Sequence, residues 1–293
     1  MISELLDAHF ISKKQAQQKH LDRLFPTQSS TFIAYPKYKK LEGKCMRAAY
    51  YHCMGMEESP GLTLRNHLIF KMGDYTEKMI LDILKEKGDL VEEGTKFFNE
   101  QYNISGRLDA IIKHEGKEVG LEIKSIGSNK YAINHIFGSK WNEAFPKWQN
   151  LFQTIIYCYV FRDRIDEFII LYIRRDTCET KEFIVSLQPK DGKLYPCIDG
   201  KLDERFCVED ILERYSQLSE FIRLGILPPK EYQKIYPANM IQQYLKAGFM
   251  SRYMAEKYKT EPFGDINCRF CGYSDLCEQD FIVESEEDET SDT

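Results

Sequence analysis

Three charged residues near the middle of the chain have the types and spacing of a metal-dependent hydrolytic site. The segment "GRLDAII" carries Asp109, and "VGLEIKS" places Glu122 and Lys124 two positions apart among apolar residues. Side chains two apart in a β-strand lie on the same face of the strand. If the two segments pair as a hairpin, two carboxylates and one ammonium meet at one place. Like charges that close repel each other unless a cation lies between them.

The turn between the two segments predicts how they pair. A turn centred on Glu115 and Gly116, where glycine tolerates positive φ, sets residues whose numbers sum to 231 opposite each other, so Asp109 faces Glu122. A Mg²⁺ ion would relieve the repulsion, because hard cations prefer carboxylate and carbonyl oxygens and their bound waters can attack a phosphodiester. Lys124 would then stabilise charge on the phosphate or help to deprotonate the water. The alternative is a surface hairpin with an ordinary Glu–Lys pair.

Three cysteines near the end of the chain form a second group with the spacing of metal ligands. In "CRFCGYSDLC" the pattern C-x2-C-x5-C joins Cys268, Cys271 and Cys277, and no cysteine or histidine follows that could complete a four-ligand site. The fourth ligand must therefore come from far upstream. Thiolates favour Zn²⁺ or an iron–sulfur cluster.

The composition indicates a soluble, globular protein of the reducing cytoplasm. Hydrophobic residues make up 43% of the 293, the nine cysteines are an odd number, and the charged N-terminus lacks an apolar centre. We therefore expect free thiols and no membrane partner. The net charge of −6 comes from the tail "ESEEDETSDT" (284–293), which holds six acids and no base. We expect a disordered, solubilising tail, and the alternative is a DNA mimic that occupies the protein's own basic groove.

Periodicity predicts a mixed α/β domain in which helices flank one sheet that contains the charged hairpin. Helices are expected at 1–25, around "CMRAAYYHCMG", in "GDYTEKMILDILKEKG", in "WNEAFPKWQNLFQTIIYCYVF" and through most of 208–260. Further strands are expected in "EFIILYIRRD" and "KEFIVSL", and loops after Pro26 and in "PCIDGKLDERF". The chain then divides into an N-terminal helical region (1–100), a core (101–190), a C-terminal helical region (191–283) and the acidic tail (284–293).

The charged hairpin followed by the three C-terminal cysteines resembles the motif order of the RecB-like PD-(D/E)XK exonucleases that carry an iron–sulfur cluster. These exonucleases are a group of the restriction-endonuclease-like superfamily. The group includes the CRISPR-associated exonuclease of this kind and the nuclease domain of the AddB helicase subunit. In these proteins the fourth cysteine precedes the core in a C-x-R context followed by aromatics, which "KCMRAAYY" matches. The resemblance thus implies that Cys45 completes a [4Fe–4S] cluster joining the two ends of the chain, and Cys53 and a structural Zn²⁺ are the alternatives. A cluster that closes so long a loop would stabilise the fold, so we expect it to be structural. The alternative is that the cluster senses redox conditions.

The resemblance also implies the remaining members of the catalytic site. A family element Gly-x3-His or Gly-x3-Glu is matched by "GDYTE", which ends at Glu77. A family element Q-x3-Y is matched by Gln153 and Tyr157, which would hold DNA near the lysine, with Gln149 one turn earlier as an alternative. The implied metal ligands are Glu77, Asp109, Glu122 and the carbonyl of Ile123.

The implied activity is that of a stand-alone Mg²⁺- or Mn²⁺-dependent deoxyribonuclease, an exonuclease acting on single strands or DNA ends. No helicase phosphate-binding loop accompanies the motifs. Basic residues interleaved with aromatics suit a single strand, and an ordinary solvated patch is the alternative. The candidate DNA contacts are Tyr35, Lys37, Tyr38, Lys39, Lys40, Arg174 and Arg175. Two rival functions are a nuclease-like scaffold that partners a helicase or a recombination or integration complex, and a zinc-stapled endonuclease.

Overall fold

The computed structural model describes residues 23–59, 63–140 and 142–279 of the chain. Most of the helix expected at 1–25 and the whole acidic tail lie outside these ranges. Within them, no helix is both long enough and apolar enough to cross a membrane.

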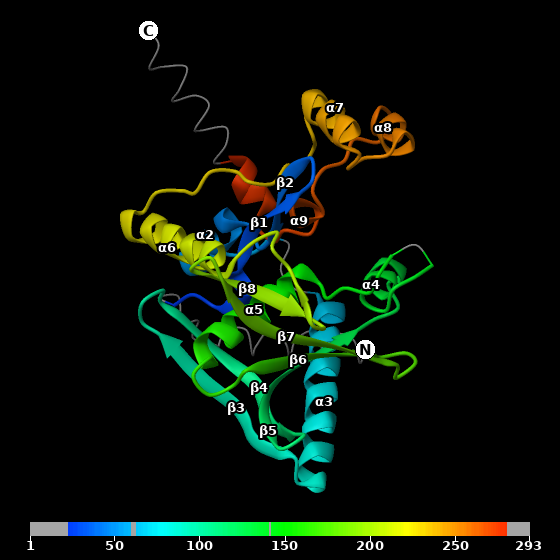
Figure 1. The fold of residues 1–293 in the computed structure, drawn as a ribbon. Helices are drawn as coiled ribbons and strands as arrows, with labels where there is room; N and C mark the ends of the chain where they lie inside the picture. Colours follow the sequence, from blue (N-terminus) through cyan, green and yellow to red (C-terminus); the bar gives the residue numbers. More distant parts are fainter. Residues whose placement is uncertain (1–22, 60–62, 141, 280–293) are drawn as a thin grey trace, which may run out of the picture.

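A seven-stranded sheet forms the centre of the molecule, and its strands are ordered across the sheet as they are along the chain (Figure 1). The strands are β3 (Leu90–Asn99), β4 (Ile104–His114), β5 (Lys117–Ile126), β6 (Glu167–Arg174), β7 (Thr180–Lys190), β8 (Lys193–Ile198) and β9 (Lys201–Leu202). Neighbours pair antiparallel except β5 and β6, which are parallel. A parallel pair needs a crossover, and here it contains α4 (Lys130–Ile136) and α5 (Trp148–Phe161).

Helices cover both faces of this sheet, as the alternation along β6 demonstrates. Phe168 and Ile170 belong to the larger core, to which α5 contributes. Ile169 and Ile173 belong to a smaller core, to which α3 (Leu64–Lys87) contributes. Because successive side chains of a strand point to opposite faces, α5 and α3 lie on opposite sides of the sheet.

The ends of α3 follow from its sequence. Thr63 precedes the helix, and its Oγ1 accepts a hydrogen bond from the backbone N–H of Asn66 at 3.3 Å. Gly88 ends the helix in the left-handed conformation with φ of 82°, which glycine adopts without strain. Of the residues in α3, only Leu81 is buried, so the helix lies on the sheet with much of its surface exposed.

The β4–β5 hairpin has the predicted register. Ala110 lies opposite Leu121, and the pairing continues in step to the turn, so that paired residue numbers sum to 231. Glu115 and Gly116 both have positive φ, which is the conformation of the two central residues of a type I′ turn.

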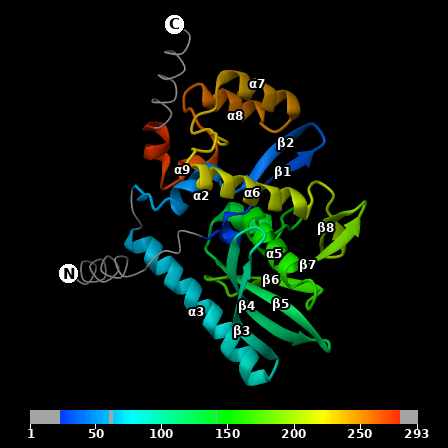
Figure 2. The ribbon, with the colours of Figure 1, turned by 90° about the vertical axis from the view of Figure 1, so that its left-hand side faces the viewer.

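The N- and C-terminal parts of the described chain pack together beside the sheet. The N-terminal part contains a turn of 3₁₀ helix (Pro26–Gln28), the hairpin of β1 (Ser30–Tyr35) and β2 (Tyr38–Gly43), and α2 (Met46–Cys53). The C-terminal part contains α6 (Val208–Leu224), α7 (Ala238–Ala247), α8 (Arg252–Tyr258) and α9 (Ile266–Arg269). Figures 1 and 2 both place α2 beside α6 and α9. Direct hydrogen bonds join the two parts, since the Tyr232 hydroxyl donates to the Gly43 carbonyl at 3.1 Å and Asn267 Nδ2 donates to the same carbonyl at 3.2 Å.

The expected α/β class is confirmed, but the sheet is larger than expected. It begins at Leu90 and ends at Leu202, so it extends past both boundaries of the expected core, and the regions expected to be helical contain strands. Strand β3 lies at an edge and mixes charged with apolar residues, so it lacks the alternation of a half-buried strand. The segments expected to be loops contain the β1–β2 hairpin, the end of β8 and the whole of β9. These strands are short, and turn residues separate them.

Candidate functional site

Asp109 and Glu122 meet where the two strands of the hairpin stop pairing. Both side chains are buried, and only 1% of Glu122 is exposed. Asp109 Oδ2 accepts a hydrogen bond from the backbone N–H of Ile123 at 2.7 Å, which holds the Asp109 carboxylate against β5. Lys124 lies on the same face as Glu122 and forms an ion pair with its Oε1. The structure thus brings together the three charged residues that the sequence singles out.

Burial makes both carboxyl groups weaker acids. Burial and then the Glu122 charge raise the pKa of Asp109 from 3.8 to about 7. Burial also raises the pKa of Glu122, against the opposing effect of the Lys124 ammonium. For Lys124, burial acts to lower the pKa, but the Glu122 and Asp109 carboxylates outweigh it and the pKa is raised. One ammonium therefore does not compensate two buried carboxylates.

Glu77 reaches the same place from α3. Gly73, one turn earlier, faces β5, where an added Cβ would be in ordinary contact with Ser125 Oγ at 3.6 Å. Glu77 Oε1 accepts a hydrogen bond from Arg107 Nη2 at 3.0 Å. Burial raises the pKa of Glu77, and the Asp109 charge raises it further. The third expected carboxylate therefore belongs to the same electrostatic cluster.

Gln153 and Tyr157 form a buried hydrogen-bonded pair. Gln153 Nε2 donates to the Tyr157 hydroxyl at 2.8 Å, and this hydroxyl donates to the carbonyl of Arg107 at 3.1 Å. Burial, followed by the nearby Glu122 charge, raises the pKa of the Tyr157 phenol. Through this contact α5 holds β4 two residues before Asp109. Gln149, the alternative, is exposed at the start of α5.

The donor set of this site fits a hard divalent cation. Glu122 Oε2 is buried without a hydrogen-bond partner, which is unfavourable for a carboxylate oxygen unless a cation or water binds it. In the described part of the chain, no three His, Cys, Asp or Glu side chains already stand close enough to hold a metal ion. Glu77 and Glu122 are instead paired with Arg107 and Lys124. Metal binding therefore requires these two carboxylates to exchange their ion pairs for the metal.

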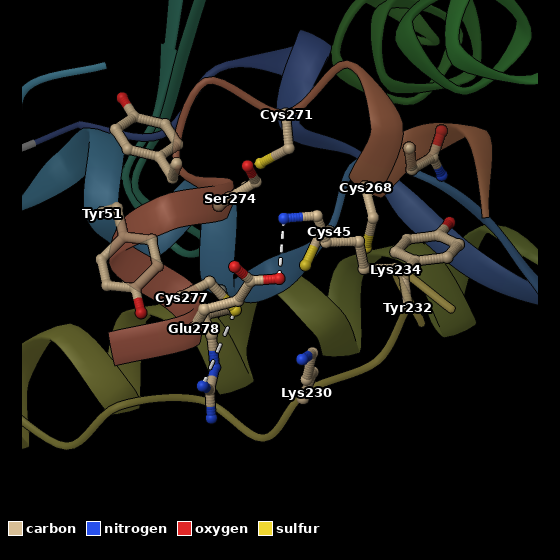
Figure 3. A pocket seen from close by; sticks show the side chains of 14 residues that line it. Cys45, Tyr51, Lys230, Tyr232, Lys234, Cys268, Cys271, Ser274, Cys277 and Glu278 are labelled. Carbon is tan, nitrogen blue, oxygen red and sulfur yellow. Dashed lines mark hydrogen bonds and ion pairs between the residues drawn. The ribbon is translucent and has the colours of Figure 1, made fainter. Parts of the chain in front are cut away.

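Four cysteines from the two ends of the chain line one pocket (Figure 3). They are Cys45, Cys268, Cys271 and Cys277. Cys45 immediately precedes α2, and Cys268 lies in α9. The pocket also contains the ion pair of Lys234 Nζ and Glu278 Oε1, 2.7 Å apart. The structure thus places the expected fourth cysteine in one pocket with the C-terminal three. No three of these thiols are close enough to share one metal ion as they stand, but a soft metal or an iron–sulfur cluster suits such a donor set.

Cys53, the alternative fourth ligand, is not among the described residues that line this pocket. It is the last residue of α2, so about 12 Å of helix separates it from Cys45. Its side chain is buried in the larger core, and its sulfur accepts a hydrogen bond from Gln28 Nε2 at 3.6 Å. Cys53 therefore has a packing role in this structure.

Burial in the pocket raises the pKa of two of its thiols, Cys45 and Cys268. Burial raises the pKa of Cys45 to about 11, although backbone N–H groups at the start of α2 act in the opposite direction. Burial and then the charge of Cys45 raise the pKa of Cys268 to about 12, with smaller contributions from Cys271 and Cys277. A bound cation would reverse this effect, because metal ligation requires thiolates.

The aromatic and basic residues of the β1–β2 hairpin gather at its tip. The rings of Tyr35 and Tyr38 are stacked with centroids 4.8 Å apart, and Phe249 lies 5.0 Å from Tyr38. Lys40 Nζ lies 4.8 Å from the centroid of the Phe249 ring and also forms an ion pair with Glu42 at 2.8 Å. The exposed lysines of this hairpin are Lys37 and Lys39.

The two arginines after β6 differ in their partners. Arg174 forms ion pairs with Asp176, at 3.1 Å, and with Glu179, so its charge is locally compensated. Arg175 Nη1 donates to Ser125 Oγ at 3.1 Å, and Gly73 of α3 faces the same hydroxyl. Because successive side chains of β5 point to opposite faces, this contact places Arg175 on the α3 side of the sheet, whereas Lys124 points to the other side.

Sequence reasoning missed Arg107 and Lys147. Arg107 lies two residues before Asp109 on β4, and this spacing could have marked it as a neighbour of the site. Lys147 precedes α5, and burial followed by the Arg175 charge lowers its pKa. Nothing in the local sequence marks Lys147, because the fold alone brings it to Arg175.

Comparisons with known proteins add little to this account. No family model matches the chain, and no curated protein matches it. A solved structure described as the crystal structure of SSO0001 is similar at 18% sequence identity with a TM-score of 0.45, over 94% of this chain and 96% of that one. A likeness this distant says nothing about activity, so function is inferred from the residues of the site.

Proposed function

We propose that the protein is a metal-dependent DNA nuclease with a restriction-endonuclease-like core, and that it acts as an exonuclease on single strands or DNA ends. The observation that carries this proposal is the pair of buried carboxylates, Asp109 and Glu122, beside Lys124, with one Glu122 oxygen lacking a partner. Buried charges of one sign are unfavourable unless a cation compensates them.

Each residue of the site has a distinct role in this proposal. The metal ligands are Glu77, Asp109, Glu122 and the carbonyl of Ile123. Mg²⁺ or Mn²⁺, when bound, supplies charge neutralisation at the phosphate and an activated water. Lys124 and Arg107 lose their carboxylate partners when Glu122 and Glu77 turn to the metal, so both cationic groups become available to the phosphate. Tyr157 keeps β4 in place through its hydrogen bond to the Arg107 carbonyl.

The hairpin tip supports a single strand as substrate. Tyr35, Tyr38 and Phe249 form an aromatic cluster that a nucleotide base would contact at its exposed edge, and Lys37 and Lys39 are exposed beside it. Stacking and phosphate pairing together are typical of proteins that bind single strands without sequence preference. Arg175 would add a further contact to the DNA backbone.

The four cysteines would hold a [4Fe–4S] cluster that joins the N- and C-terminal parts. The supporting observation is the convergence of all four on one pocket. The competing group is Zn²⁺, which takes four thiolates equally well. Visible absorption and iron and sulfide analysis of anaerobically purified protein distinguish the two, because a zinc protein is colourless.

The activity is tested with end-labelled single-stranded DNA and Mn²⁺, with Lys124→Met as the matched control. A nuclease gives products that require the divalent ion and are absent from the control. A DNA-binding scaffold gives no such products, and that result would overturn the proposal. Circular single strands and strands blocked at either end then separate exonuclease from endonuclease action and give the polarity of digestion.

A further inference from the structure

The solvent-facing side of α3 carries a stripe of exposed apolar side chains. It consists of Leu68, Met72, Tyr75, Met79 and Ile83, whose exposed fractions lie between 44% and 68%. At 3.6 residues per turn these positions fall within about 80° of one another around the helix axis. This spacing is that of a helix face that packs against another element.

The stripe is separate from the face that α3 uses on the sheet. Glu77 and Leu81 lie on the opposite side of the helix, where Leu81 is buried in the smaller core. An open apolar groove adjoins the stripe at its N-terminal end, and its lining residues are Leu64, Arg65, Leu68, Ile69, Met72 and Arg175. Exposed apolar surface of this length on one helix indicates a binding surface.

We propose that the N-terminal segment of this chain, residues 1–22, binds along the stripe of α3. Four of its apolar residues, Ile2, Leu5, Leu6 and Phe10, have the spacing of one helix face, which matches the stripe in character and covers about half of its length. The proposal does not depend on the nuclease activity.

The attachment point of the segment lies within reach of α3. Leu24 is fixed beside Ile104 at the start of β4 by two backbone hydrogen bonds of 2.9 Å, to Asn103 and from Ser105. Three residues further along β4, about 10 Å away, Arg107 contacts Glu77 in the middle of α3. From the Glu77 side of α3, the path of the chain around the helix to the stripe adds about 20 Å at most. The twelve residues 12–23 can span about 40 Å.

The size of the stripe favours a tethered segment over a second copy of the chain. From Leu68 to Ile83 the stripe is about 22 Å long and about 10 Å wide, so two copies would bury about 440 Å² in total. Stable protein interfaces bury roughly 1,200 Å² or more. A segment of the same chain is tethered and binds at an effective concentration in the millimolar range. A contact area too small for a stable dimer is therefore large enough for this segment to bind.

The test uses the full-length protein with Phe10 replaced by the photo-crosslinking residue benzoylphenylalanine. We expect a crosslink at monomer mass to the peptide that contains Leu68 to Met79, and its loss in the same protein carrying Met72→Glu and Met79→Glu. Hydrogen exchange gives an independent readout, because Leu6→Glu with Phe10→Glu should speed amide exchange in α3 at least tenfold. The matched control, Gln17→Glu with Gln18→Glu, should leave exchange unchanged.

Three results would each overturn the proposal. The first is a crosslink to another region or none at all. The second is a crosslink at dimer mass that depends on protein concentration, which would assign the stripe to a second copy. The third is unchanged exchange in α3 when Leu6 and Phe10 are both replaced by Glu.

Discussion

Replacing Asp109 by Asn should stabilise the metal-free protein at alkaline pH. Asp109 is buried beside Glu122, and its pKa is raised from 3.8 to about 7. The folded state therefore holds this proton more tightly than the unfolded state does, and the free energy of unfolding falls as pH rises from about 4 to about 7. The asparagine does not ionise, and its side-chain oxygen can still accept the hydrogen bond from the Ile123 N–H.

The size of this effect follows from the pKa difference. A rise from 3.8 to about 7, at about 1.4 kcal/mol for each pH unit, gives about 4 kcal/mol. In a chain of this length that is a difference in melting temperature of up to about 10 °C. The difference should be absent below about pH 4 and complete above about pH 7.

Thermal unfolding of the wild type and Asp109→Asn in a chelator, between pH 5 and pH 9, measures this difference. Adding excess Mn²⁺ at pH 8 should then reverse the order, because only the wild type retains all three carboxylates. A variant that is less stable than the wild type at pH 8 in chelator, or a difference that does not change with pH, would refute the reasoning.

Three further substitutions test the other roles. Lys124→Met should lower the single-turnover cleavage rate by about 10³-fold while Mn²⁺ still raises the melting temperature, since an ammonium does not bind metals; loss of the metal effect would contradict this role. Tyr157→Phe removes a buried hydrogen bond to the Arg107 carbonyl and should cost about 1 kcal/mol in urea unfolding and slow cleavage; no change in either measurement would exclude the positioning role. Cys45→Ser should abolish the visible absorption of the cluster and lower the melting temperature, whereas Cys53→Ser should keep the absorption; the opposite pattern would exchange the two assignments.

The β4–β5 hairpin could be predicted because the sequence pattern that specifies it lies within the hairpin itself. Alternating polarity identifies each strand, Gly116 marks the turn, and the register follows from counting. The same local signals identify most helices, including α3 from Gly73 to its end at Gly88. The structure shows that α3 begins nine residues before Gly73, at Leu64 after Thr63. The placing of Asp109 beside Glu122 required no knowledge of the rest of the fold.

The remaining parts of the site depend on contacts that no local pattern encodes. Arg107 and Glu77 are thirty residues apart in sequence and meet only because α3 crosses the hairpin. The Q-x3-Y element predicted Gln153 and Tyr157 as residues of the site, but its periodicity did not indicate that both are buried and bound to the β4 backbone. Strand β3 was not predicted, because an edge strand tolerates charged residues on both faces and so lacks the alternating pattern of a half-buried strand.

Both candidate sites bury groups that are unfavourable when ionised, but different cations would stabilise the two sites. Burial raises the pKa of Asp109 at one site and of Cys45 at the other, so each site is unfavourable in its ionised form unless a cation binds. The oxygen ligands of the first select hard ions that keep their waters, whereas the sulfur ligands of the second select soft metals. A chelator of hard divalent ions should therefore empty the carboxylate site and leave the thiol site loaded. If the cysteines hold a metal or cluster as proposed, its loss should instead affect the packing of the N- and C-terminal parts, because the four thiols come from both.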